Sequence, residues 1–109
     1  MADHVRVETT TDSAEDANRL TESVVNARLV ACAQVVGPIR STYWWEGAAT
    51  TDEEWLLVLK TAADRLDALV AHLRHEHAYA VPEIVAVPVT GGNPDYLQWV
   101  TDETRASSR

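Results

Sequence analysis

Three histidines gather near the end of a predicted helix, at His72, His75 and His77. Imidazole nitrogens are common ligands of transition metals, and His72 and His75 stand three residues apart, so they would share one helix face and could share an ion. Histidines near a helix C-terminus also favour its dipole, and Leu73 continues a core-facing stripe beside His72. The histidines alone therefore leave a metal site and a purely structural role open.

Cys32 is the only cysteine of the chain. Its thiolate would be a soft ligand suited to copper. It stands among small apolar residues in a stretch typical of a strand, where a free cysteine is more often a small buried hydrophobe. A single cysteine excludes a disulfide within the chain and suits a reducing compartment.

Glu83 follows Pro82 at the start of a predicted strand. Its carboxylate could be a hard oxygen ligand, an ion-pair partner for Lys60, or a strand-end acid bonded to backbone donors. Lys60, Tyr79, Glu83 and Trp99 would together suit a small anion or metabolite in a cleft between subunits. A structural hydrogen-bond network is an equally good interpretation of the same residues.

The sequence contains no motif of a known catalytic machinery. There is no glycine-rich phosphate loop, no G-x-S-x-G elbow and no H-E-x-x-H pair. Cys32 lacks a base supplied by its local sequence. We therefore expect a binding or regulatory protein that is not an enzyme and requires no cofactor, with a divalent cation such as Cu²⁺ as a possible ligand.

The net charge and the hydropathy of the chain limit the classes of partner that we expect. With 9 Lys and Arg against 17 Asp and Glu, the net charge is −8, which repels phosphate backbones and argues against nucleic acid. The longest aliphatic run, residues 56–59, is far too short to span a bilayer, and no secretory signal precedes it. The expected location is the cytoplasm, without a membrane partner.

Three large aromatic residues stand in a row at Tyr43, Trp44 and Trp45. Because a strand alternates its faces, Tyr43 and Trp45 project one way and Trp44 the other. A single half-buried sheet has no need for apolar bulk on both sides. We therefore expect these three residues to lie in an interface between subunits of an obligate assembly.

The elements that must position these residues follow from hydrophobic periodicity. Residues 5–8, 30–36, 39–45, 54–60 and 84–89 are typical of strands, with a bulge at Gly37-Pro38 and a turn over 46–50. Helices are expected over 13–28, capped by Asp12 or Ser13, over 61–77, capped by Thr61, and over 95–103. Residues 9–13 are expected to form a turn, and 104–109 a frayed tail.

This order predicts one domain over residues 1–109 with an α+β fold. Strand, helix, strand, strand, helix, strand is the split βαβ pattern of the ferredoxin-like fold, here with an extra C-terminal helix. The second and third strands would form a long hairpin. Right-handed crossovers would place both long helices on one face of a four-stranded antiparallel sheet.

Six segments, taken in order, resemble the CutA family, the divalent-cation tolerance proteins. They span nearly the whole chain and are residues 28–33 (RLVACA), 43–47 (YWWEG), 59–61 (LKT), 81–83 (VPE), 86–90 (AVPVT) and 92–100 (GNPDYLQWV). The resemblance implies a compact homotrimer of ferredoxin-like subunits whose hairpins extend the sheets across subunit boundaries. It also implies a link to metal-ion tolerance, with copper bound by several members and no secure enzymatic reaction.

The resemblance also bears on the site. His77 corresponds to the histidine of the family's His-Pro-Tyr-x-x-Pro-Glu motif, with Ala78 in place of the proline, and Cys32 corresponds to a common family cysteine. His77, Cys32 and Glu83 are thus the candidate metal ligands. Glu76 and Thr9 occupy two positions where some copper-binding relatives carry a histidine and a thiol. The alternatives are a small-molecule sensor resembling the P-II proteins, with its ligand between subunits, and a structural or protein-anchoring trimer.

Overall fold

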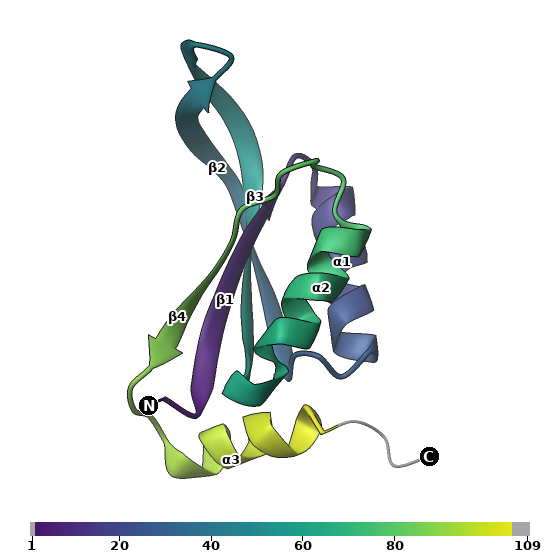
Figure 1. Ribbon diagram of the computed structural model, residues 1–109, viewed down its shortest axis with the longest axis vertical. Helices are drawn as coiled ribbons and strands as arrows, with labels where there is room; N and C mark the ends of the chain where they lie inside the picture. The colour runs from purple at the N-terminus through teal and green to yellow at the C-terminus, as the bar shows by residue number, and fades with distance from the viewer. Residues whose placement is uncertain (1, 106–109) are drawn as a thin grey trace.

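The structure is a computed structural model that describes residues 2–105. Four strands and three α-helices follow one another along the chain (Figure 1). Their bounds are β1 (His4–Thr11), α1 (Ala14–Asn26), β2 (Cys32–Trp45), β3 (Ala48–Ala62), a short 3-10 helix η1 (Ala63–Arg65), α2 (Leu66–Glu76), β4 (Ile84–Val89) and α3 (Pro94–Glu103).

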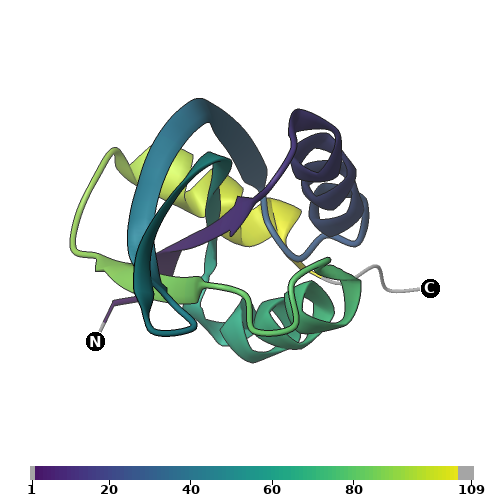
Figure 2. The same ribbon diagram turned by 90° about the horizontal axis from the view of Figure 1, so that it is seen from above.

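The sheet has the strand order β2-β3-β1-β4, and every neighbouring pair is antiparallel. Helices α1 and α2 lie side by side on one face of this sheet, and α3 runs across its lower end (Figures 1 and 2). The predicted α+β, ferredoxin-like arrangement with an extra C-terminal helix is confirmed.

The core lies between the sheet and the two long helices. Val7 of β1 and Leu57 and Leu59 of β3 are fully buried against Leu20 of α1 and Leu69 of α2. The alternating pattern of each strand and the three-to-four spacing of each helix bring these side chains to the same layer. This layer covers one face of the sheet, and α1 and α2 leave the other face uncovered.

Local signals decide where the helices begin. Ser13 is the N-cap of α1, and its hydroxyl accepts the backbone N–H of Asp16 at 3.0 Å, which settles the choice between Asp12 and Ser13. The expected cap at Thr61 is wrong. Thr61 belongs to β3, where its buried hydroxyl donates to the carbonyl oxygen of Leu29 at 2.7 Å, and the helical turn starts only at Ala63.

The hairpin of β2 and β3 is longer than predicted. The register shifts between Val36 and Ile39, which confirms the bulge. The expected five-residue turn is wrong, because only Glu46 and Gly47 separate the strands, both with positive φ (50° and 82°), as a tight type I′ turn requires. The hairpin consequently projects beyond the helices (Figure 1).

Two further expectations fail at strand and chain ends. Residues 9–11 continue β1 rather than forming a turn, because Thr9 and Thr11 are buried on the helix side. Residues 104 and 105 are held in place, since Thr104 is buried and Arg105 makes a two-pronged ion pair with Asp64 at 2.7 and 2.9 Å. The rest of the predicted frayed tail, residues 106–109, lies outside the described residues.

Candidate functional site

His77 follows the last residue of α2 and joins three segments through one ring. Its Nε2 donates to the carbonyl oxygen of Thr10 at 2.8 Å and lies 3.1 Å from the hydroxyl of Thr9. Its Nδ1 accepts the backbone N–H of Tyr79 at 3.1 Å. These partners define a neutral ring protonated on Nε2, and burial lowers the pKa of His77. Both nitrogens are thus occupied within the chain.

Tyr79 extends this arrangement to the hairpin. Its hydroxyl donates to the carboxylate of Glu54 on β3 at 2.7 Å, and its ring lies 5.0 Å from that of His77. Burial and the bond to Glu54 raise the pKa of Tyr79 far above its usual value. The phenol therefore remains a donor at neutral pH and holds the connector against the sheet.

Glu83 lies close to two other carboxylates. Partial burial, and then the charges of Glu8 and Glu54, raise its pKa. No ion pair between Glu83 and Lys60 forms among residues 2–105. The strand register explains this, because Lys60 is level with Arg6 and Val87, three residues further along the sheet than Ile84. Glu83 precedes Ile84 by one more residue, so at about 3.4 Å per residue roughly 14 Å of strand separates the two groups.

Cys32 lies at the other end of the sheet from Glu83. It is partly exposed, pairs with Lys60 across β2 and β3, and its Sγ is 3.7 Å from the hydroxyl of Tyr96 on α3. Tyr96 also packs against Trp99, with ring centroids 5.7 Å apart. The four predicted cleft residues therefore fall into two groups within one chain: Lys60 with Trp99, and Tyr79 with Glu83.

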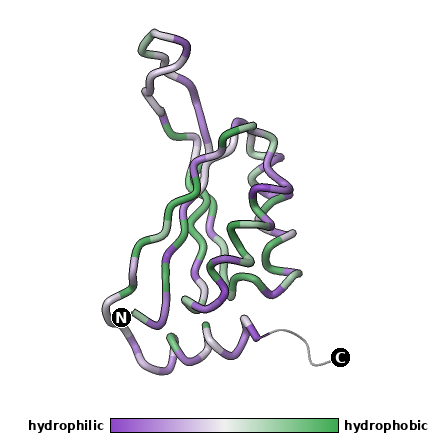
Figure 3. Tube along the Cα trace, in the orientation of Figure 1, coloured by the Kyte–Doolittle hydropathy of each residue, from purple (hydrophilic) through white to green (hydrophobic). Residues whose placement is uncertain are grey.

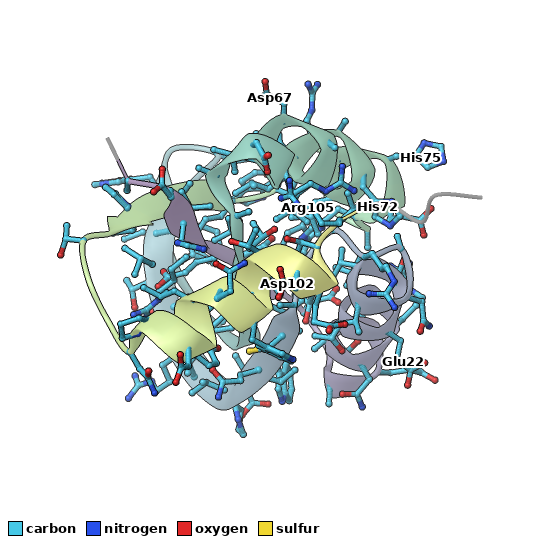
Figure 4. All side chains as sticks on the ribbon, turned by 90° about the horizontal axis from the view of Figure 1, so that it is seen from below. Glu22, Asp67, His72, His75, Asp102 and Arg105 are labelled. Carbon is cyan, nitrogen blue, oxygen red and sulfur yellow. The ribbon has the colours of Figure 1, made fainter. Side chains whose placement is uncertain are left out.

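The remaining histidines of α2 do not form a metal site together. His72 points toward α1, with its Nε2 2.7 Å from the hydroxyl of Ser23, whereas His75 points outward (Figure 4). Across residues 2–105, no three His, Cys, Asp or Glu side chains converge to hold a metal ion. The candidate ligands His77, Cys32 and Glu83 are thus not brought together within one chain.

The sheet face away from α1 and α2 carries exposed valines beside charged residues. Val5 and Val7 point to the helices, so their neighbours Arg6 and Glu8 and the cross-strand partners Val85 and Val87 point away. Val85 and Val87 are each about half exposed, as is Val36 on β2. Figure 3 shows β4 as a largely hydrophobic strand at the sheet edge away from the helices.

The aromatic residues of the hairpin are also exposed in the single chain. Trp44 is 77% and Trp45 60% exposed, and the hydroxyl of Tyr43 bonds the carboxylate of Asp52 on the opposite strand. Large aromatic side chains that lie exposed next to one another are typical of an interaction surface.

The sequence did not single out Glu54, Thr10 or Tyr96 for the site. Their roles depend on contacts over 25, 67 and 64 residues of chain. The one available signal was the resemblance around His77, because His77, Tyr79 and Glu83 match the spacing of the family's motif.

An antiparallel ferredoxin-like sheet with a projecting hairpin defines the structural class, and comparison with known proteins defines the family. The family model described as "CutA1 divalent ion tolerance protein" matches residues 5–103. The chain belongs to this family.

Individual relatives agree. The rice protein described as "Protein CutA 1, chloroplastic" is 45% identical over 98 residues, which are 90% of this chain and 55% of that protein. The Thermus thermophilus "Divalent-cation tolerance protein CutA" is 38% identical over 87% of this chain and 92% of its own. The crystal structure of CutA1 from Oryza sativa matches with a TM-score of 0.93 and 42% identity, covering 97% of each chain.

The chain spans only about half the length of the rice relative. In residues 2–105, no helix combines the length and the hydrophobicity that crossing a membrane demands.

Proposed function

We propose that the protein is a homotrimer that takes part in the tolerance of, or response to, divalent metal ions, with copper as the leading candidate. Its role is binding or regulation rather than catalysis, and its location is the cytoplasm. The family match over residues 5–103 carries the link to divalent cations.

The trimer is supported by the surface that one chain leaves uncovered. The side chains of Val36, Val85 and Val87 on the sheet face away from α1 and α2, and of Trp44 and Trp45 on the hairpin, are apolar and accessible. Burying apolar surface contributes about 25 cal/mol per Å². Association with identical copies would recover this free energy, and a closed ring would cover every such face.

Copper binding by Cys32, His77 and Glu83 has a definite structural requirement. The three residues do not converge in one chain, and His77 would have to release one of its two hydrogen bonds before it could offer a lone pair. A site of these residues must therefore draw on more than one copy.

Calorimetric titration with Cu²⁺ tests this assignment. We expect saturable binding by the parent protein and loss of that binding in both Cys32→Ala and His77→Ala. His75→Ala is the matched control. The side chain of His75 is 85% exposed and should bind copper only weakly on its own, so this variant should bind copper as the parent protein does. If Cys32→Ala and His77→Ala bind copper as the parent does, they are not the ligands.

A small-molecule sensor with its ligand between subunits is the second candidate. The four predicted cleft residues lie in two groups, Lys60 with Trp99 at one end of the sheet and Tyr79 with Glu83 at the other. This arrangement favours two half-sites that meet only across an interface between subunits. Native mass spectrometry of protein taken directly from cells would detect a retained metabolite. A trimer that retains neither metal nor metabolite would favour a structural or protein-anchoring role.

A further inference from the structure

We propose that the hollow between α3 and the adjoining end of the sheet binds a small aliphatic monocarboxylate, with its carboxylate held by Lys60 and Tyr96. This site adjoins the candidate metal ligand Cys32, and Lys60 also belongs to the proposed small-molecule sensor site, but binding of the monocarboxylate does not require a metal ion.

The hollow has the size and lining that such a ligand requires. Its volume is about 240 Å³, and at ~30 Å³ per water molecule it has room for roughly eight non-hydrogen atoms. Val89 of β4 and Leu97 and Val100 of α3 supply aliphatic walls, and the backbone at Gly91 and Gly92 closes one side. The hollow therefore suits an unbranched or branched chain of about five or six carbons.

Two polar donors converge at one end of this hollow. Lys60 and Tyr96 both line it. The hydroxyl of Tyr96 lies against Cys32, and Cys32 is the direct cross-strand partner of Lys60. Lys60 and Tyr96 therefore border the hollow close to Cys32, one from β3 and the other from α3. An aliphatic pocket with a few convergent polar groups is the usual form of a small-molecule site.

Both donors lack a strong acceptor. Lys60 donates only to the amide oxygen of Gln34, at 3.0 Å, and within residues 2–105 no carboxylate lies within ion-pair distance of it. Its neighbour Arg6 is paired with Glu8 at 2.6 Å. Among the described residues, the hydroxyl of Tyr96 has only the Cys32 sulfur, a weak acceptor. A carboxylate would satisfy both groups in a chain whose net charge otherwise repels anions.

The other polar groups of the hollow are already engaged. His4 bonds the hydroxyl of Thr101 at 2.8 Å, and Thr61 donates to the carbonyl oxygen of Leu29. Neither needs a ligand. The geometry thus favours one anionic group at the Lys60 end and an apolar remainder, rather than a ligand with several polar groups.

Titration of the ¹⁵N-labelled full chain with sodium hexanoate, followed by amide shifts with a chelator present, tests the proposal. We expect saturable shifts centred on Gly91 and Gly92. On the same parent protein, hexan-1-ol and acetate should each bind at least tenfold more weakly, because one lacks the charge and the other the chain.

Variants then locate the carboxylate. Lys60→Met should weaken hexanoate binding at least tenfold and Tyr96→Phe several-fold. Arg6→Met is the matched control, since Arg6 neighbours Lys60 but does not line the hollow, and it should bind as the parent does. The proposal is overturned if hexanoate gives no saturable shifts, if hexanol binds the parent equally well, or if Lys60→Met retains full affinity. The chelator keeps these outcomes independent of copper.

Discussion

His77 shows how one side chain can order several segments at once. It bonds the end of β1 through Thr10 and the connector through Tyr79, and Tyr79 in turn bonds Glu54 of β3. The family resemblance identified His77 from sequence, but as a possible ligand. Its role as a crosslink could not be predicted, because that role depends on a carbonyl 67 residues away.

We expect His77→Ala to lower the free energy of unfolding by about 2 kcal/mol, because it leaves a carbonyl and an N–H without partners in a partly buried place. Chemical denaturation at a fixed protein concentration measures this. His75→Ala, at an exposed position on the same helix end, should change the value by less than about 0.5 kcal/mol. Equal effects of the two variants would show that the His77 bonds do not stabilise the fold.

The environment of Glu83 predicts how the stability of the fold depends on pH. Its pKa is raised in the folded chain, so the ionised form costs stability as the pH rises above the ordinary value of 4.5, and that cost is absent at lower pH. Glu83→Gln should therefore stabilise the protein at pH 7 and lose this advantage toward pH 4. Thermal unfolding across this range measures the trend.

Glu53→Gln is the control for Glu83→Gln, because it removes one negative charge from an exposed site. Any gain from lowering the net charge alone would appear in both variants. A gain at pH 7 that is no larger for Glu83→Gln than for Glu53→Gln would contradict a local cause.

At the scale of elements, periodicity predicted the number, order and type of the helices and strands. The failures lie where local and tertiary signals compete. Thr61 looked like a helix cap, yet its hydroxyl is needed by the carbonyl of Leu29 in the sheet. Residues 48–50 were expected to belong to the turn, yet they pair with β2 to the tip of the hairpin because the strands continue beyond the core.

The hairpin tip provides a test at this scale. Gly47 has a φ of +82° and open space around it, so Gly47→Ala should cost about 1 kcal/mol through backbone strain alone. Gly91→Ala is the control, because an added Cβ at Gly91 would also meet no neighbouring atom, whereas the φ of Gly91 does not lie in the left-handed region. Urea denaturation should show destabilisation only for Gly47→Ala. A neutral Gly47→Ala would mean that the turn differs from the two-residue form.

At the scale of the whole molecule, one chain leaves large apolar side chains accessible. Its helices cover one sheet face, and the other face and the hairpin indoles stay accessible. The run of aromatic residues predicted this surplus of apolar surface, because alternation places large rings on both sides of a strand. The sequence could not predict which residues would meet across a boundary, since register within one chain says nothing about a second.

Sedimentation equilibrium at micromolar concentration tests the central claim most directly. We predict a single species of about 36 kDa, three times the chain mass of 12.0 kDa. The double variant Trp44→Ser, Trp45→Ser, measured under the same conditions as the parent protein, should shift the equilibrium toward smaller species. A folded parent protein of about 12 kDa under these conditions would contradict the account.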